Sequence, residues 1–151
     1  MGLQDEVELM RNIPLFAKIE PSKLKLLAFT SERLTYSQDE ILFSQGDAGD
    51  SAYIIIGGEA DIVVNTPGGP LVVATLKQNE IVGEIAILCD VPRTATVRAK
   101  TELTTLRITK DLFFNLVIEF PQIAVEIMRE LARRLEQTTT KLREAVANAQ
   151  S

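Results

Sequence analysis

The spacing of hydrophobic positions changes twice along the chain. Between about residues 30 and 109, apolar and polar residues alternate, which is the period of β-strands. The strand candidates are short and rich in β-branched residues: 41–43, 53–56, 62–64, 71–76, 96–97 and 103–108. Glycine, proline and aspartate separate them, as in turns. Many short strands with frequent turns predict a mainly β, antiparallel body of the jelly-roll type.

Both ends of the chain have helical spacing instead. Residues 4–11 carry acids early and a basic residue late, as a helix dipole favours. Pro21 opens a second short helix, and Pro121 begins a long one that runs without Gly or Pro to about residue 148. These patterns predict one domain in three parts: an N-terminal helical segment at 1–29, a β-roll at 30–109, and C-terminal helices at 110–148.

Composition restricts the function classes. The 151 residues, 46% hydrophobic and 25% charged, are those of a soluble globular domain. Histidine is absent and Cys89 is the single cysteine, which excludes histidine-based triads and zinc hydrolase sites. We therefore predict no catalytic residues, no metal site and no enzyme. The net charge of −5 disfavours a nucleic-acid binder. Without a signal peptide or a bilayer-spanning stretch, a cytoplasmic location off the membrane is expected.

The stretch 81–97 is the most unusual part of the sequence. Residues 84–88 are too apolar for a surface turn and too few for an ordinary helix. A one-turn helix there would leave its first amides unpaired, and an anion is their natural acceptor. Gly83 would let a ligand approach the backbone, and Arg93 would give a phosphate a bidentate partner. Glu84 would accept hydrogen bonds from ribose hydroxyls. These features together indicate a phosphorylated sugar.

The motif Gly83-Glu84-Ile85-Ala86-Ile87-Leu88, followed after three residues by Pro92-Arg93-Thr94-Ala95, resembles the phosphate-binding cassette of the cyclic nucleotide-binding domain family. The cassette spans 83–95. Residues 46–58 are similar to the glycine-aspartate turn and strand of that family, and 13–16 to its N-terminal helical element. The similarity covers about residues 10–135. Val82 stands where the family usually has an aromatic residue, which changes local packing more than ligand chemistry.

The resemblance implies an eight-stranded antiparallel β-roll with N-terminal helices and a C-terminal helical pair. It also implies cAMP or cGMP as the ligand and no cofactor. Arg93 would pair with the cyclic phosphate and Glu84 with the ribose 2′-hydroxyl. Amides around the remaining cassette positions would line the phosphate: Ile85, Ala86, Thr94 and Ala95. Val72 and Val73 are expected near the base. Arg129 is a candidate to cap the purine, with Met128 and Leu131 as alternatives.

The function predicted from this resemblance is a sensor in which the ligand moves the last helix as a hinged lid. The signal would then pass to an unidentified downstream protein or through a homodimer. A degenerate member that binds no ligand and acts as a dimeric interaction module is the alternative. A DNA-binding regulator would need a helix-turn-helix after the last helix, and none is expected in this chain. Thr94 leaves the choice between cAMP and cGMP open.

Several side chains also have simpler interpretations. Arg93 can form a salt bridge with Glu84 or Asp90. Cys89 is predicted to be a small buried hydrophobe. The last helix has an imperfect heptad pattern, in which Leu135 and Leu142 are predicted to meet a partner. The pair at 133–134 alternates with acidic residues and is predicted to lie on a salt-bridged solvent face.

Overall fold

The computed structural model describes residues 7, 8, 10–13, 16, 17 and 19–150. The start of the predicted helix at 4–11 and two residues of the segment 13–16, Pro14 and Leu15, lie outside the described residues.

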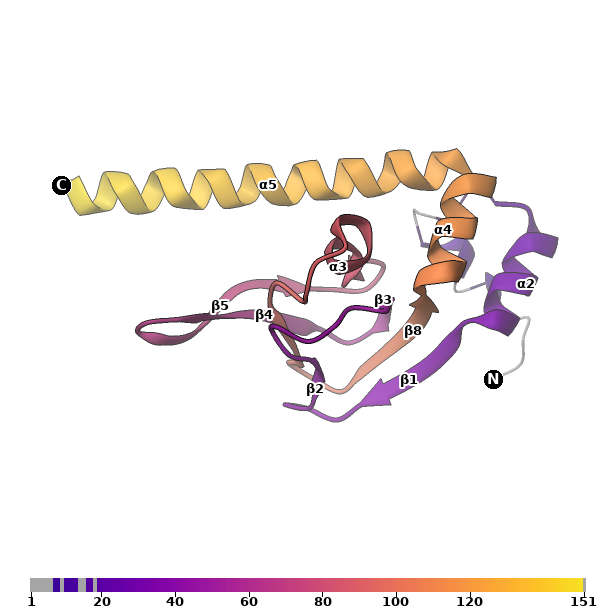
Figure 1. Cartoon of the computed structure of the whole chain (residues 1–151), viewed down its shortest axis with the longest axis horizontal. Helices are drawn as coiled ribbons and strands as arrows, with labels where there is room; N and C mark the ends of the chain where they lie inside the picture. Colours follow the sequence, from indigo (N-terminus) through magenta and orange to yellow (C-terminus); the bar gives the residue numbers. More distant parts are fainter. Residues whose placement is uncertain (1–6, 9, 14–15, 18, 151) are drawn as a thin grey trace.

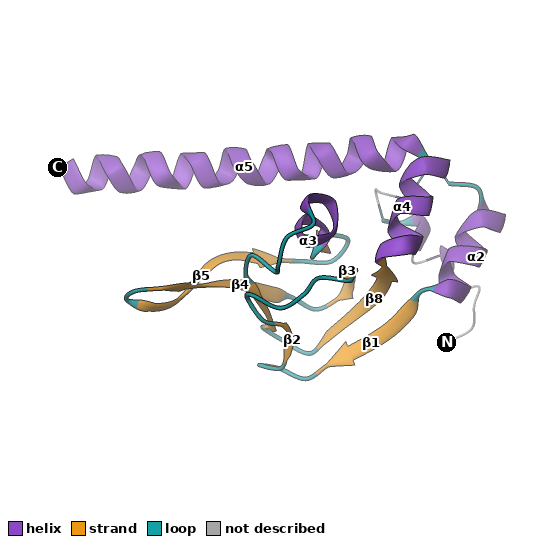
Figure 2. Ribbon diagram, viewed as in Figure 1, coloured by secondary structure: helices purple, strands orange, loops and turns teal. Residues whose placement is uncertain are grey.

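Within the described residues, eight antiparallel strands form two four-stranded sheets (Figure 2). The strands are β1 (Glu32–Tyr36), β2 (Ile41–Phe43), β3 (Ser51–Gly57), β4 (Ala60–Thr66), β5 (Gly69–Leu76), β6 (Ile81–Val82), β7 (Thr96–Ala99) and β8 (Leu103–Thr109). One sheet has the order β1-β8-β3-β6 and the other β2-β7-β4-β5. The predicted eight-stranded β-roll is therefore confirmed.

The helices gather on one side of the roll. They are α2 (Pro21–Thr30), α3 (Glu84–Cys89), α4 (Lys110–Glu119) and α5 (Pro121–Gln150). The helical path breaks at Phe120 because Pro121 disfavours helical backbone in the residue before it. Figure 1 shows α5 running above α3 and alongside the β4–β5 hairpin. The predicted N-terminal helix and C-terminal helical pair are thus present. No helix in the described part of the chain is long and apolar enough to cross a membrane.

Strand β3 is buried on both faces and joins two hydrophobic clusters. Ile54 and Ile56 face the cluster under the helices, whereas Tyr53 and Ile55 face the cluster between the sheets. The first cluster includes Met10, Phe16, Leu24, Ile108, Phe113, Ile123 and Ile127. The second includes Val82, Val97 and Leu103. Because Ile123 and Ile127 are buried in the first cluster, the first turns of α5 are fixed to the roll beside the cassette.

Candidate functional site

Helix α3 is the short helix expected inside the β-body. Its N-cap, Gly83, has a φ of +90°, a backbone conformation that favours glycine. A Cβ at this position would lie 2.6 Å from Nη1 of Arg93, so any larger residue would displace the guanidinium. Glu84 and Ala86 are buried, while Ile85 is partly exposed. Glycine thus permits the close approach of the helix start to Arg93.

Arg93 is buried, with 4% of its surface exposed. Nη1 donates to the carbonyl of Gly83 and Nη2 to the carbonyl of Ser51, both at 2.8 Å. Nε is buried without a hydrogen-bond partner, and Cζ lies 4.0 Å from the centroid of the Phe43 ring. Burial lowers the pKa of Arg93. In the described structure this guanidinium has carbonyl and aromatic partners.

Neither carboxylate that the sequence offered as a salt-bridge partner of Arg93 takes that role. Glu84 pairs with Arg134 and Asp90 with Lys110. Asp47, Asp50 and Glu84 act on the pKa of Arg93 through their charge, without a hydrogen bond to it among the described contacts. The guanidinium of Arg93 therefore contacts two carbonyls and an aromatic ring, all of them neutral groups. A buried positive charge without an ion pair favours the binding of an anion.

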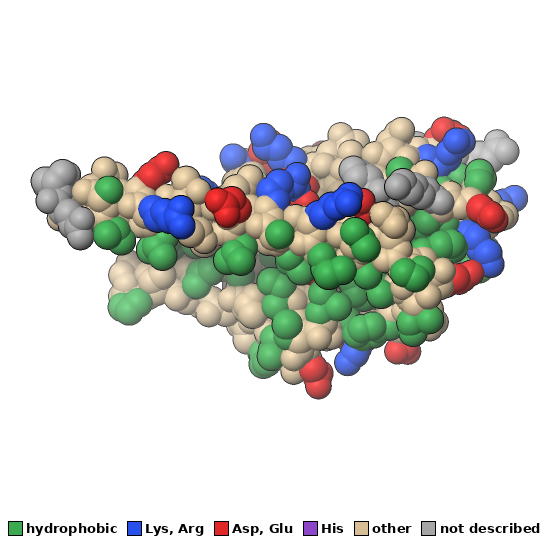
Figure 3. All heavy atoms as spheres, turned by 90° about the horizontal axis from the view of Figure 1, so that it is seen from above, with side chains coloured by type: hydrophobic (Ala, Val, Ile, Leu, Met, Phe, Trp, Pro, Cys, Tyr) green, Lys and Arg blue, Asp and Glu red, His purple; other side chains and the backbone are tan. Residues whose placement is uncertain are grey.

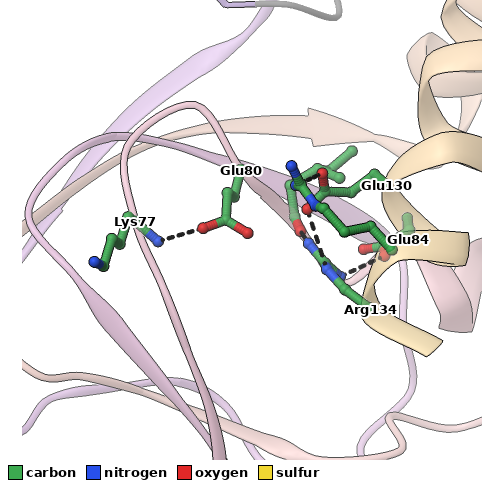
Figure 4. A network of polar contacts seen from close by, with 7 residues as sticks. Lys77, Glu80, Glu84, Glu130 and Arg134 are labelled. Atoms are coloured by element: carbon green, nitrogen blue, oxygen red, sulfur yellow. Dashed lines mark hydrogen bonds and ion pairs between the residues drawn. The ribbon is translucent and has the colours of Figure 1, made fainter. Parts of the chain in front are cut away.

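Glu84 lies almost completely out of solvent, at 1% exposure. Its Oε1 accepts a hydrogen bond from Nη1 of Arg134 at 2.9 Å, and Nη2 of the same arginine donates to the carbonyl of Ile81 (Figure 4). Oε2 of Glu84 is buried and has no partner among the described atoms. Burial raises the pKa of Glu84, and the charge of Arg134 opposes that rise. One carboxylate oxygen is thus fixed and the other remains available to a donor.

Arg134 is the site residue that the sequence analysis missed. The predicted solvent face is correct for Arg133, which is 57% exposed, but wrong for Arg134, which is 21% exposed. Arg134 lies seven residues after Ile127 and three after Leu131, both of which pack on the core. Residues with these spacings share one face of a helix, so the signal was present in the periodicity.

A groove of about 1490 Å³ separates β5 from α5. Val72 and Val73 line it from β5, and Arg129 and Arg134 from α5. The Arg129 side chain is 70% exposed and contacts Glu126 at 3.1 Å. Of the alternatives to Arg129, Leu131 packs against the core instead. The structure thus brings three of the positions expected near the base, Val72, Val73 and Arg129, to one groove.

The remaining predicted positions lie at the ends of the cassette. Thr94 is exposed and Ala95 half-buried, just before β7. Cys89 is exposed, so the prediction of a buried cysteine is wrong. The reason is that α3 has only about one and a half turns, and Ala86 and Ile87 already fill its buried face. The described residues contain no group of three or more histidine, cysteine or carboxylate side chains placed to hold a metal ion.

The family described as cyclic nucleotide-binding domain matches residues 33–119. The chain is 27% identical over 140 residues to the CRP-like cAMP-activated global transcriptional regulator of Mycobacterium tuberculosis, covering 92% of this chain and 62% of that protein. It is 34% identical over 108 residues to the cAMP-dependent protein kinase regulatory subunit of Yarrowia lipolytica, covering 72% and 28%. It therefore spans less than two thirds of the length of either relative.

Among solved structures, the chain has the fold of a regulatory subunit of a cAMP-independent protein kinase A from Trypanosoma brucei. The TM-score is 0.76 at 22% identity, covering 93% of this chain and 51% of that one.

Proposed function

Because the chain belongs to the cyclic nucleotide-binding domain family, we propose that it binds cAMP or cGMP and transmits occupancy through α5. The observation that carries the proposal is the buried guanidinium of Arg93, bonded to two backbone carbonyls. Arginine has five N–H donors, of which the carbonyls take two. A cyclic phosphate, a monoanion, would supply the missing countercharge and accept from the donors that remain.

Glu84 supports the same ligand from the sugar side. Its Oε2 is buried without a partner next to the cassette glycine. A buried polar atom left unpaired is costly, on the order of 1–3 kcal/mol. The 2′-hydroxyl of a ribose, as a donor, would remove that cost. An anion site at Arg93 and a hydroxyl acceptor at Glu84, both within the cassette, thus fit a ribose-linked phosphate.

The alternative is a degenerate member whose site is closed by its own side chains. One observation favours it: Arg134 already holds one oxygen of Glu84. The other Glu84 oxygen and Nε of Arg93 remain without partners, which favours a site that can still take a ligand. Isothermal titration of the chain with cAMP and with cGMP separates the two. We expect saturable binding of at least one nucleotide. If neither nucleotide binds at millimolar concentration, the chain is a degenerate family member that takes no ligand.

Arg134 gives α5 a direct connection to the ligand site. It bridges the Glu84 side chain and the Ile81 carbonyl from the middle of the helix. A ligand changes the position of α5 only if it binds one position more tightly than another. Because a 2′-hydroxyl and Arg134 share the Glu84 carboxylate, ligand occupancy and the docking of α5 are energetically coupled.

We expect Arg134→Met to weaken nucleotide binding about 3- to 10-fold, the scale of a partly exposed, charge-assisted hydrogen bond. Arg134 fixes Oε1 and favours the charged form of Glu84, while Oε2 stays available. Titration measures the affinity, and hydrogen exchange of residues 121–150 measures the docking of α5. Arg143→Met is the matched control, because Arg143 is exposed on the same helix and does not line the groove. Tighter binding by Arg134→Met would show instead that the guanidinium blocks the ligand.

We also propose that α5 pairs with a second copy of the chain. Hydrophobic side chains line one side of the helix (Figure 3). In the sequence of α5, three exposed hydrophobic residues recur every seven positions: Met128, Leu135 and Leu142, which are 59%, 68% and 63% exposed. Heptad spacing is typical of helix pairing.

The double variant Leu135→Glu/Leu142→Glu is therefore expected to sediment as a monomer at concentrations where the unaltered chain sediments as a dimer. Gln137→Glu/Thr140→Glu adds the same charge to other faces of α5 and should remain dimeric. A monomeric unaltered chain at about 100 μM, far above the Kd of a specific protein complex, would rule out this pairing.

A further inference from the structure

One short segment holds both the backbone and the side chain of Arg93. The turn that follows β2 exchanges two hydrogen bonds with the Arg93 backbone: from the Gly46 amide to the Arg93 carbonyl at 2.8 Å, and from the Arg93 amide to the Asp47 carbonyl at 2.7 Å. The last residue of β2, Phe43, lies under the guanidinium, with Cζ 4.0 Å from the ring centroid. The segment 43–47 is therefore the support of Arg93, although it lies outside the cassette.

The aromatic ring of Phe43 is itself fixed in place. Opposite β7, the register of β2 shifts between Ile41 and Phe43, and Phe43 pairs with Val97. A bulge of this kind changes the direction of a side chain relative to a regular strand. The ring lies 5.8 Å from that of Tyr53 at an interplanar angle of 33°. Tyr53 is buried in the core between the sheets, so the ring has a rigid neighbour.

The two hydrogen bonds to carbonyls would, by themselves, still allow the plane of the Arg93 guanidinium to tilt about the line through Nη1 and Nη2. They hold Nη1 and Nη2, whereas Nε has no hydrogen bond and faces Gly49, where a Cβ would lie 3.2 Å away. An aromatic face attracts a cation within about 6 Å of its centroid. The Phe43 ring thus adds the contact that sets the plane of the guanidinium.

We propose that Phe43 is a positioning residue for anion binding: its ring holds Arg93 in the plane that a bound phosphate needs. This inference rests on the proposed function, in which Arg93 contacts the cyclic phosphate. Since the ring acts through the phosphate contact and not through the base, its loss should affect cAMP and cGMP by the same factor.

The test compares Phe43→Leu with Phe43→Tyr by titration at a temperature well below unfolding. Removing the ring should weaken the binding of both nucleotides about 3- to 10-fold, the range for a desolvated cation–π contact. Phe43→Tyr keeps the ring and should bind within about twofold of the unaltered chain, because the cation–π contact persists. Leu42→Ala is the control: it removes a neighbouring side chain of β2 that packs on the same cluster, and should lower stability without changing the Kd.

A second measurement does not depend on a ligand. In thermal unfolding without nucleotide, Phe43→Leu should lower Tm less in an Arg93→Met background than in the unaltered chain, because the contact is already lost. Additive Tm shifts, or a Phe43→Leu variant that binds as well as the unaltered chain, would overturn the inference. Failure of the unaltered chain to bind either nucleotide would overturn the proposed function. The comparison of Tm shifts would then still test whether the Phe43 ring contacts the Arg93 guanidinium.

Discussion

Arg93→Met is expected to weaken the binding of cAMP or cGMP by about 2–5 kcal/mol, which is roughly 30- to 5000-fold in Kd. The variant removes the buried cation and leaves the phosphate charge without its partner. Met retains much of the side-chain volume, so the packing beside Phe43 is largely preserved. The loss therefore reports the charge and not a cavity.

The stability of the ligand-free chain gives this prediction an independent check. A buried charge without an ion pair is costly, but Met also leaves the carbonyls of Gly83 and Ser51 without the donors that Arg93 supplies. Because these two effects oppose each other, we expect the Tm of Arg93→Met without nucleotide to lie close to that of the unaltered chain. Arg93→Lys keeps the charge but loses the planar fork, and should bind with intermediate affinity. Equal affinities of Arg93→Met and the unaltered chain would remove Arg93 from the ligand site.

Glu84→Gln is expected to weaken binding by about 1–3 kcal/mol, or roughly 5- to 150-fold, the scale of a lost hydrogen bond to a charged group. The amide keeps the shape of the side chain but lacks the charge that Arg134 and a hydroxyl donor share. With 2′-deoxy-cAMP or 2′-deoxy-cGMP as the titrant, the difference between the variant and the unaltered chain should largely disappear. An undiminished difference would assign Glu84 a role other than the contact to the 2′-hydroxyl.

The protonation of Glu84 adds a pH dependence with a defined sign. Burial raises the pKa of this carboxyl group, so it takes up a proton at a higher pH than an exposed glutamate does. The protonated form loses the charge that strengthens its bond to a hydroxyl. Affinity should therefore fall as the pH is lowered through the raised pKa of Glu84. The Glu84→Gln variant should lack this part of the pH profile.

The sequence predicted the architecture well because its signals are local. Alternating residues located six of the strands, and the prolines at 21 and 121 mark the starts of α2 and α5. Strand β6, with only Ile81 and Val82, is too short to show a period. The apolar stretch at 84–88 forms α3, which confirms the short helix predicted there from a length and polarity that fit neither a surface turn nor an ordinary helix.

Periodicity can place Arg134 on the inner face of α5, but local signals cannot identify the partners of the side chains that support the site. Arg134 meets Glu84 across 50 residues of sequence, and Phe43 comes beneath Arg93 only after β2 pairs with β7. Such contacts depend on how the helix and the second sheet dock on the cassette. Local propensity carries no information about that docking. The resemblance named the groups that would touch a ligand, whereas the structure adds the groups that hold them.

The unbroken length of α5 gives it the geometry of a lever. At 1.5 Å per residue, its 30 residues extend about 45 Å from Pro121. A pivot of about 10° at that end would carry the far tip about 8 Å, by the same helix geometry. Arg134 lies 13 residues after Pro121, about 20 Å along the axis, so a displacement of the helix at that point would be magnified roughly twofold at the far tip.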